Sequence, residues 1–170
     1  MNILLSETEQ NLLVLLEELT KHHDWIEFPV LAEKLNFSTE ELQEHLFKLE
    51  QLFPNLLIQS TKEGIQLQFE ARNSLDPRIA IFEQSKTYSF LNRLFFKEGQ
   101  SLDQIGQELM IGYEQVQETI QHLNTKLPQH YGIKVQLSPL VMEGEEEDIR
   151  AFYLDYFIQS YSFLDWPFSS

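Results

Sequence analysis

The stretch SLDQIGQELMIGYEQVQETIQHLN, at residues 101–124, decides the fold because it has the pattern of two short helices joined by a tight turn. Ser101 is a suitable N-cap for a first helix over residues 102–109. Apolar residues then return at helical spacing over residues 113–126, and Pro128 is expected to end this second helix. The pattern is typical of a helix-turn-helix motif.

The first half of the chain repeats this motif at a shift of 74 residues without a gap. A short helix over residues 29–35 precedes another helix that begins after the N-cap Ser38. Ala32 and Gly106 correspond, and small residues there would let the two helices of each motif approach closely. Other core positions correspond in the pairs Leu31/Ile105, Leu35/Leu109, Phe37/Ile111, Leu42/Val116, Leu46/Ile120 and Leu49/Leu123. Two such patterns at one spacing indicate a duplicated unit.

Flanking segments extend both motifs toward winged helix-turn-helix units. Residues 7–21 are expected to form an amphipathic helix, with Ser6 as its N-cap. Beyond the third helix the hydrophobic period changes from 3.6 to 2, which predicts a β-hairpin over residues 56–70 with Gly64 at its turn. Residues 133–142 have the same alternation and predict a second hairpin.

A connection over residues 73–77 is expected to lead into one long amphipathic helix, residues 78–97, which Gly99 stops. The predicted fold is therefore mainly α with small β-hairpins: two tandem winged helix-turn-helix units joined by a long helix. The first unit should span residues 1–73, and the linker helix with the second unit should span residues 74–142.

Composition narrows the possible functions. Lys and Arg number 12 against 27 Asp and Glu, a net charge of −15 that is unusual for a protein that neutralises phosphates. Without cysteine there can be no disulfide or Cys-based zinc site, and His22-His23 has no further ligands at metal spacing. The chain also has no Gly-rich phosphate loop and no nucleophile elbow. We expect no metal, no cofactor and no enzymatic activity.

The sequence shows no signal for a membrane or for secretion. No apolar stretch reaches the roughly 18 residues of a membrane span, and the N-terminus lacks the positive region of a secretion signal. These features predict a cytoplasmic protein with no membrane partner.

The acidic segment EGEEED occupies residues 143–148. It is interpreted as the first turn of a helix starting near Glu145, where the helix dipole favours negative charge, rather than as a Ca²⁺ site.

Three stretches resemble the Mga and anthrax-toxin-activator family of bacterial transcription regulators. They are the motif at residues 101–124, YGIKVQLSPLVMEGEEEDIRAFYLDYF at residues 131–157, and DWPF at residues 165–168. The pattern G-E-x-x-x-I-R-x-F/Y, beginning at Gly144, opens the first regulatory domain in that family. The resemblance therefore implies that residues 143–170 start a following helical regulatory domain. It also implies that the chain is an N-terminal fragment or a short relative.

The same resemblance implies the DNA-binding region of a transcription regulator, with double-stranded DNA as its partner and homo-oligomerisation through regions beyond this chain. Residues 39–51 and 113–126 would enter major grooves, and the wing around Lys62 would contact the backbone. The candidate DNA contacts are Thr39, Gln43, Lys48, Lys62, Tyr113, Gln115, Gln117, Thr119 and Lys126.

Acidic side chains on the same two helices favour a different function. Carboxylates that face phosphates repel them and release no counterions. The acidic residues are Glu40, Glu41, Glu44, Glu50, Glu114 and Glu118. An alternative interpretation is therefore a degenerate acidic winged-helix module that mediates protein–protein interaction.

Overall fold

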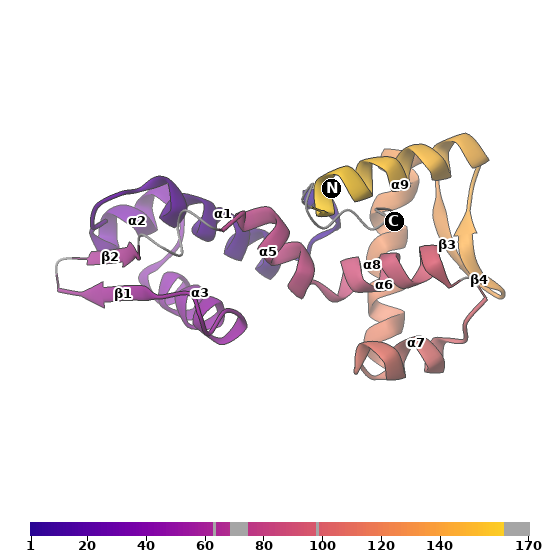
Figure 1. The fold of residues 1–170 in the computed structure, drawn as a ribbon, viewed down its shortest axis with the longest axis horizontal. Coiled ribbons are helices and arrows are strands. Elements are labelled where there is room, and N and C mark those ends of the chain that lie inside the picture. Colours follow the sequence, from indigo (N-terminus) through magenta and orange to yellow (C-terminus); the bar gives the residue numbers. More distant parts are fainter. Residues whose placement is uncertain (63, 69–74, 98, 162–170) are drawn as a thin grey trace, which may run out of the picture. The chain divides into compact units, whose positions relative to one another are not determined.

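The computed structural model describes residues 1–62, 64–68, 75–97 and 99–161, which are mainly helical with two small antiparallel hairpins (Figure 1). The chain divides into two compact units. The N-terminal unit comprises Ser6–Ile81, and the C-terminal unit comprises Phe82–Ser170 together with Met1–Leu5. Among the described residues, no helix has the length and apolar character needed to cross a membrane.

The N-terminal unit is a three-helix domain with a β-hairpin wing. Its elements are α1 (Glu7–Lys21), α2 (Phe28–Leu35), α3 (Thr39–Leu52), β1 (Ile58–Thr61) and β2 (Gly64–Leu67). The predicted N-caps form, since the hydroxyls of Ser6 and Ser38 accept hydrogen bonds from backbone amides three residues later. The core is almost entirely aliphatic and includes Leu12, Leu15, Leu16, Leu19, Leu31, Leu42, Leu49, Ile65 and Leu67.

The wing of this unit is fixed to the segment between α1 and α2. Ile26 and Ile65 exchange two backbone hydrogen bonds, with N–O distances of 2.9 and 2.8 Å. Gly64 lies beside this bridge at φ +139°, and a Cβ there would come within 2.2 Å of the Ile26 carbonyl oxygen. Only glycine fits at this position, so the residue predicted for the turn also lets the wing approach the helical core.

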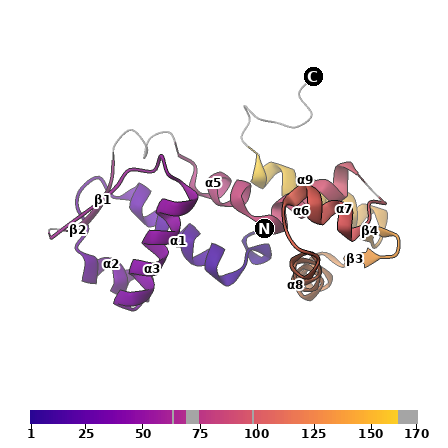
Figure 2. The ribbon, with the colours of Figure 1, turned by 90° about the horizontal axis from the view of Figure 1, so that it is seen from below.

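The C-terminal unit repeats the arrangement with additional helical cover. Its elements are η1 (Asn2–Leu4), α6 (Lys86–Phe96), α7 (Leu102–Leu109), α8 (Tyr113–Tyr131), β3 (Lys134–Leu137), β4 (Leu140–Glu143) and α9 (Glu146–Ser160). Within this unit α8 crosses α6 and α9, as Figures 1 and 2 show together. The core here is aromatic, with the rings of Phe82 and Tyr88 stacked at 4.1 Å and those of Tyr88 and Tyr156 at 5.4 Å. As predicted, the acidic segment opens a helix, with Glu145 as the N-cap of α9.

The prediction of one long helix over residues 78–97 is wrong. Two helices occupy this segment, α5 (Pro77–Gln84) and α6, and they are separated at Ser85. Ser85 has an extended backbone, and its hydroxyl accepts a hydrogen bond from the amide of Tyr88 as the N-cap of α6. On one continuous helix Phe82 and Tyr88 would lie about 120° apart around the axis. The break allows their rings to stack in the core.

The prediction that Pro128 ends the second helix of the C-terminal motif is also wrong, because α8 continues to Tyr131. Proline inside a helix loses one backbone hydrogen bond and costs about 3 kcal/mol. Tertiary contacts around the last turns offset this cost. Leu127 is completely buried, and the amide side chain of Asn124 bonds the backbone N and O of Val135 at 2.7 and 2.9 Å.

Candidate nucleic-acid interface

The two helix-turn-helix motifs have the same local geometry, as the ungapped repeat predicted. The bounds of α2 and α7 differ by 74 residues at both ends, and so do the first residues of α3 and α8. The turn residues Asn36 and Met110 are both left-handed, with φ/ψ of 56°/40° and 54°/41°. The N-caps Ser38 and Gly112 are both extended, at −68°/165° and −72°/161°. Each recognition helix therefore leaves its turn in the same direction.

A close contact between the two helices of each motif follows the turn. In the C-terminal unit, the amide of Ile111 donates to the Gly106 carbonyl at 2.9 Å. A Cβ on Gly106 would lie 3.0 Å from the Ile111 carbonyl oxygen and 3.5 Å from Cγ2 of Val116. Ala32, the equivalent residue of the N-terminal unit, is buried. The predicted requirement for small residues at this contact is confirmed.

The wings repeat with an offset of 76 residues instead of 74 and differ in charge. In the N-terminal unit Lys62 lies exposed between β1 and β2, as expected for a backbone contact. In the C-terminal unit Ser138 and Pro139 stand between β3 and β4, and the nearby Lys134 pairs with Glu143 at 3.2 Å. Only the first wing therefore presents a lysine at its tip within the described part of the chain.

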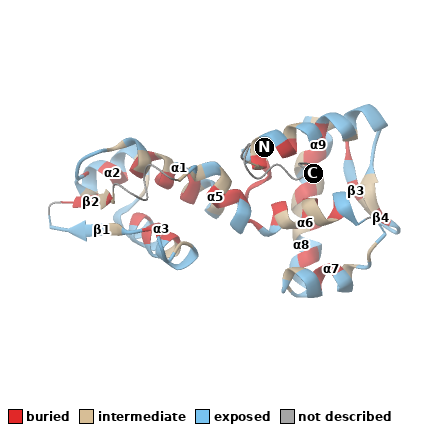
Figure 3. Ribbon diagram, viewed as in Figure 1, coloured by how far each residue is buried: buried red, intermediate tan, exposed pale blue. Residues whose placement is uncertain are grey.

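The recognition helices α3 and α8 bury one side and expose the other (Figure 3). The buried sides are those predicted, since they consist of Leu42, Leu46 and Leu49 in α3 and of Val116, Ile120 and Leu123 in α8. His45 is buried on α3 as well. Among the candidate contacts, the exposed residues are Thr39, Gln43, Lys62, Tyr113, Gln115 and Gln117, and the half-buried ones are Lys48, Thr119 and Lys126.

Several candidate contacts are engaged in local interactions. Gln115 accepts a hydrogen bond from the amide of Gly112 at 3.1 Å and so caps α8. Thr119 donates its hydroxyl proton to the Gln115 carbonyl at 2.8 Å, and Lys48 pairs with Glu44 at 2.6 Å. DNA contact by these three side chains stays a prediction, and it would require them to give up or share these local interactions.

The remaining candidates are better placed for an external partner. Gln117 donates to the Tyr113 hydroxyl at 3.2 Å, and this pair lies on one exposed side of α8. Within the described residues, no hydrogen bond or ion pair engages the side chains of Thr39, Gln43, Lys62 and Lys126. The structure thus brings together a small polar set at the start of each recognition helix, plus one lysine on the first wing.

The acidic charge is spread over both units. The N-terminal unit has six basic and fourteen acidic residues, and the C-terminal unit has six and thirteen. Among the residues that the structure describes, six cations form ion pairs with carboxylates, namely Lys34, Lys48, Arg93, Lys97, Lys134 and Arg150. A hydrogen bond from Lys48 holds the pKa of Glu44 below its usual value, so Glu44 remains charged at neutral pH. Few cations are left to neutralise phosphates.

Comparison with known proteins gives a consistent result for both units. The model described as the M protein trans-acting positive regulator (MGA) HTH domain matches residues 6–65, and the Mga helix-turn-helix domain model matches residues 76–157. A predicted trans-acting regulator of Streptococcus pneumoniae serotype 4 is 32% identical over 175 residues, which cover all of this chain and 35% of that protein.

Two capsule synthesis positive regulators of Bacillus anthracis are also similar. AcpB is 30% identical over 88 residues, which cover 52% of this chain and 18% of AcpB. AcpA is 20% identical over 158 residues, which cover 91% of this chain and 32% of AcpA. The chain thus spans about a third of the length of the Streptococcus protein and of AcpA.

Proposed function

The chain belongs to the Mga family of helix-turn-helix regulators, and from that premise we propose that it binds double-stranded DNA in a sequence-dependent way, as the DNA-binding region of a bacterial transcription regulator. The observation that carries this proposal is the matched geometry of the two motifs. Each ends in a recognition helix whose first turns are exposed, which is the part that contacts base edges in helix-turn-helix proteins. The proposed role is regulatory and not enzymatic.

The proposed contacts divide between base reading and backbone positioning. Gln43 on α3 and Gln117 on α8 carry amides that can pair with the adenine edge in the major groove. Thr39 and Tyr113, at the first position of each helix, lie beside them. Lys62 on the first wing would contact a phosphate and so fix the position of the N-terminal unit.

The acidic composition sets the expected strength of binding. Few free cations mean few released counterions, so affinity for unrelated sequences should be low and should depend weakly on salt. Association through regions outside this chain would bring a second copy to the same duplex and raise the effective affinity. Such homo-oligomerisation is part of the proposal for the whole regulator.

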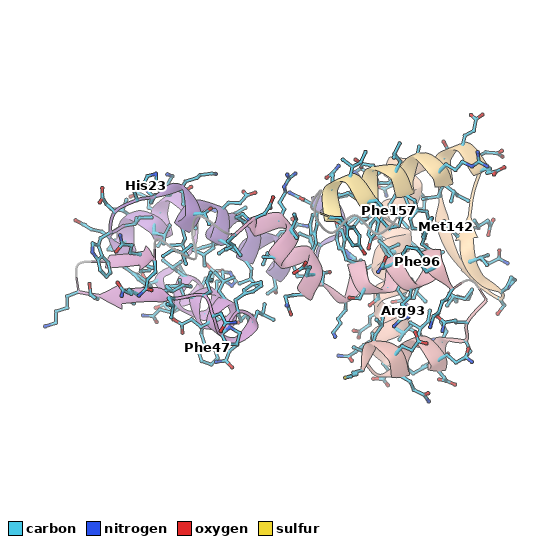
Figure 4. All side chains as sticks on the ribbon, in the orientation of Figure 1. His23, Phe47, Arg93, Phe96, Met142 and Phe157 are labelled. Carbon is cyan, nitrogen blue, oxygen red and sulfur yellow. The ribbon has the colours of Figure 1, made fainter. Side chains whose placement is uncertain are left out.

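Protein–protein interaction is the second candidate function, and one observation favours it. Phe47 is 61% exposed on α3, one turn beyond Gln43 on the same side of the helix, and it points away from the helix bundle (Figure 4). An exposed aromatic ring among carboxylates fits a partner with an apolar and basic surface better than it fits a phosphate backbone.

A fluorescence anisotropy titration with duplex DNA at several salt concentrations tests the proposal. We expect saturable binding at low salt and a shallow slope of log affinity against log salt, about −0.9 for each phosphate contact. If the chain binds no duplex at low salt, even when fused to a dimeric carrier and with its helical content intact, the protein–protein function is favoured instead.

A further inference from the structure

The exposed sides of the two recognition helices carry the same three side chains. At the shift of 74 residues, Glu40, Gln43 and Glu44 of α3 correspond to Glu114, Gln117 and Glu118 of α8. All six residues are exposed. These shared residues can be read from the sequence, but they lie outside the core positions that define the repeat.

Packing and capping do not account for the identity. The buried apolar positions of the two helices exchange one apolar residue for another, apart from Leu49 and Leu123, and the buried His45 corresponds to the half-buried Thr119. The capping residues are Glu41 and Gln115, which differ and are not part of the set. Exposed neighbours differ as well, since Thr39 is replaced by Tyr113 and Phe47 by Gln121. The helix dipole favours the acidic residues Glu40 and Glu114 in the first turn, but neither packing nor capping requires the same glutamine and glutamate at the fifth and sixth positions.

The shared residues also occupy the same place in each motif. They are the second, fifth and sixth residues of their helices, and this spacing puts them on one face over the first two turns. Because Asn36 and Met110 share one left-handed conformation, and the N-caps share one extended conformation, this face has the same orientation relative to each turn.

We propose that the two recognition helices read the same short base element, which contains both cytosine and adenine, so that each binding site holds two copies of it. This inference rests on the proposed DNA-binding function. Carboxylates at Glu40, Glu44 and their counterparts would accept hydrogen bonds from cytosine N4, and the amide of Gln43 or Gln117 would pair with adenine N6 and N7.

The chemistry of these side chains explains how an acidic helix discriminates between sequences. A glutamate in the groove that meets guanine faces two acceptor atoms, and one that meets thymine faces an acceptor oxygen and a methyl group, so the carboxylate is desolvated without a partner. Partners outside the set hold two of the side chains in place, since Lys48 pairs with Glu44 at 2.6 Å and the Tyr113 hydroxyl binds Gln117 at 3.2 Å. The carboxylates thus disfavour wrong sequences more than they strengthen the right one.

Selection from a pool of randomised duplexes with the 170-residue chain, followed by anisotropy titrations of the selected sites, tests the inference. We expect each selected site to contain two copies of one element with cytosine and adenine. Gln43→Ala should relax the adenine preference in one copy, and Gln117→Ala should relax it in the other. The loss of discrimination should be about 5- to 150-fold, as found for a good side chain–base pairing.

Matched variants separate base reading from general electrostatics. Glu44→Gln and Glu118→Gln should each reduce the cytosine preference of a single copy, while Gln107→Ala, on the exposed surface of α7, should change neither. Selected sites with two unrelated elements, or preferences unaffected by any of the four variants, would overturn the inference and leave DNA binding standing. Failure to enrich or bind any duplex at low salt would overturn both.

Discussion

Asn36 and Met110 adopt the same left-handed backbone conformation at equivalent turns, with φ of 56° and 54° and ψ of 40° and 41°. Asparagine tolerates this region far better than an unbranched apolar residue does. The side chain of Met110 is 92% exposed, so no packing compensates for the backbone strain. The turn geometry of the motif is therefore kept in the C-terminal unit at an energetic cost.

Replacing Met110 should consequently stabilise the C-terminal unit. We expect Met110→Gly and Met110→Asn to raise its stability by about 1 kcal/mol, because both residues enter the left-handed region more easily. The gain in stability for Met110→Gly should be smaller than the relief of backbone strain alone suggests, because glycine also increases the entropy of the unfolded chain. Thermal unfolding measured by circular dichroism checks this, with Asn36→Met as the reciprocal change that should lower the melting temperature. A lower melting temperature for both Met110 variants would contradict it.

Gly106 should not accept a larger residue. Its Cβ would lie 3.0 Å from the backbone oxygen of Ile111, so Gly106→Ala requires a small shift of α7, and Gly106→Leu should cost about 1–3 kcal/mol by overpacking. Urea unfolding gives the free energy directly. Ala32→Gly is the matched control at the equivalent position, where removing a methyl group should have a smaller effect. Equal stability of Gly106→Leu and the parent would show that the two helices do not meet as closely as described.

The first helix of each unit is joined to its motif by an ion pair whose sign is reversed between the units. Glu18 of α1 pairs with Lys34 of α2, whereas Arg93 of α6 pairs with Glu108 of α7 at 3.0 Å, and Lys34 and Glu108 are equivalent positions. Figure 4 shows Arg93 on the side of α6 that faces α7. Lys34→Glu should therefore destabilise the N-terminal unit, because it places a second carboxylate beside the buried Glu18.

Lys34→Glu should lower the free energy of unfolding by about 2 kcal/mol. This value lies between those for surface and buried ion pairs, because the Lys34 side chain is half exposed. Lys34→Met removes the attraction without adding repulsion and should cost less. The double variant Glu18→Lys/Lys34→Glu should recover part of the loss in urea unfolding. If Lys34→Glu and Lys34→Met were equally stable, charge would not be the cause.

A buried histidine should make the stability of the N-terminal unit depend on pH. His45 lies on the buried side of α3, its ring centroid is 4.9 Å from that of Phe37 in a T-shaped arrangement, and its buried Nδ1 has no hydrogen-bond partner in the described structure. Burial lowers the pKa of His45 below its usual 6.5, and the charge of Lys48 lowers it further, against the opposing carboxylates Glu44 and Glu41. The unfolded chain thus binds a proton more readily than the folded one.

Stability should therefore be highest above pH 7 and should fall as the pH drops below about 6.5 toward the lower pKa of the folded state. His45→Leu fills the same apolar space without a titrating group and should flatten this part of the profile. Thermal unfolding at pH 7.5 and 5.5 compares the two chains. A similar loss of stability in both chains over this interval would show that His45 is not responsible.

Local signals account for what could be predicted of the fold. Capping serines at positions 6, 38 and 101 lie within three residues of the groups they bond, so the bounds of α1, α3 and α7 follow from short stretches of sequence. The break at Ser85 and the continuation through Pro128 depend on contacts with distant residues, namely the Tyr88–Tyr156 stack and the bonds of Asn124 to Val135. Sequence periodicity contains no information about such contacts.

The candidate site shows the same division between local and distant information. The exposed side of each recognition helix could be predicted, because it is the complement of the apolar positions. Gln115 is one of the predicted DNA contacts, and it also stands three residues after the N-cap, the spacing at which Gln104 and Glu41 cap their helices. Its capping role therefore has a local signal in the sequence, whereas contact with DNA does not.

Charge variants of the proposed interface should have opposite effects on binding, which distinguishes phosphate contact from repulsion. Lys62→Ala and Lys126→Ala should each reduce the salt slope by about 0.9 if the ammonium group touches a phosphate. Lys48→Ala should change the slope less, because its ammonium already pairs with Glu44 at 2.6 Å. Glu40→Gln and Glu44→Gln should strengthen binding to random duplex, since each removes a negative charge from the surface that faces the DNA.

These effects can be measured even if a single copy of the chain binds weakly. Fusion to a dimeric carrier holds two copies together, and the resulting effective concentration should make even a millimolar affinity detectable by anisotropy. Titrations at 0.01 M and 0.1 M salt show how much of the affinity is electrostatic. Electrostatic contributions weaken over this range because the Debye length falls from about 30 Å to about 10 Å. Lysine and glutamate variants with the same affinity and slope as the parent would show that neither recognition helix lies against a phosphate backbone. The bound surface would then have to be sought elsewhere on the two units.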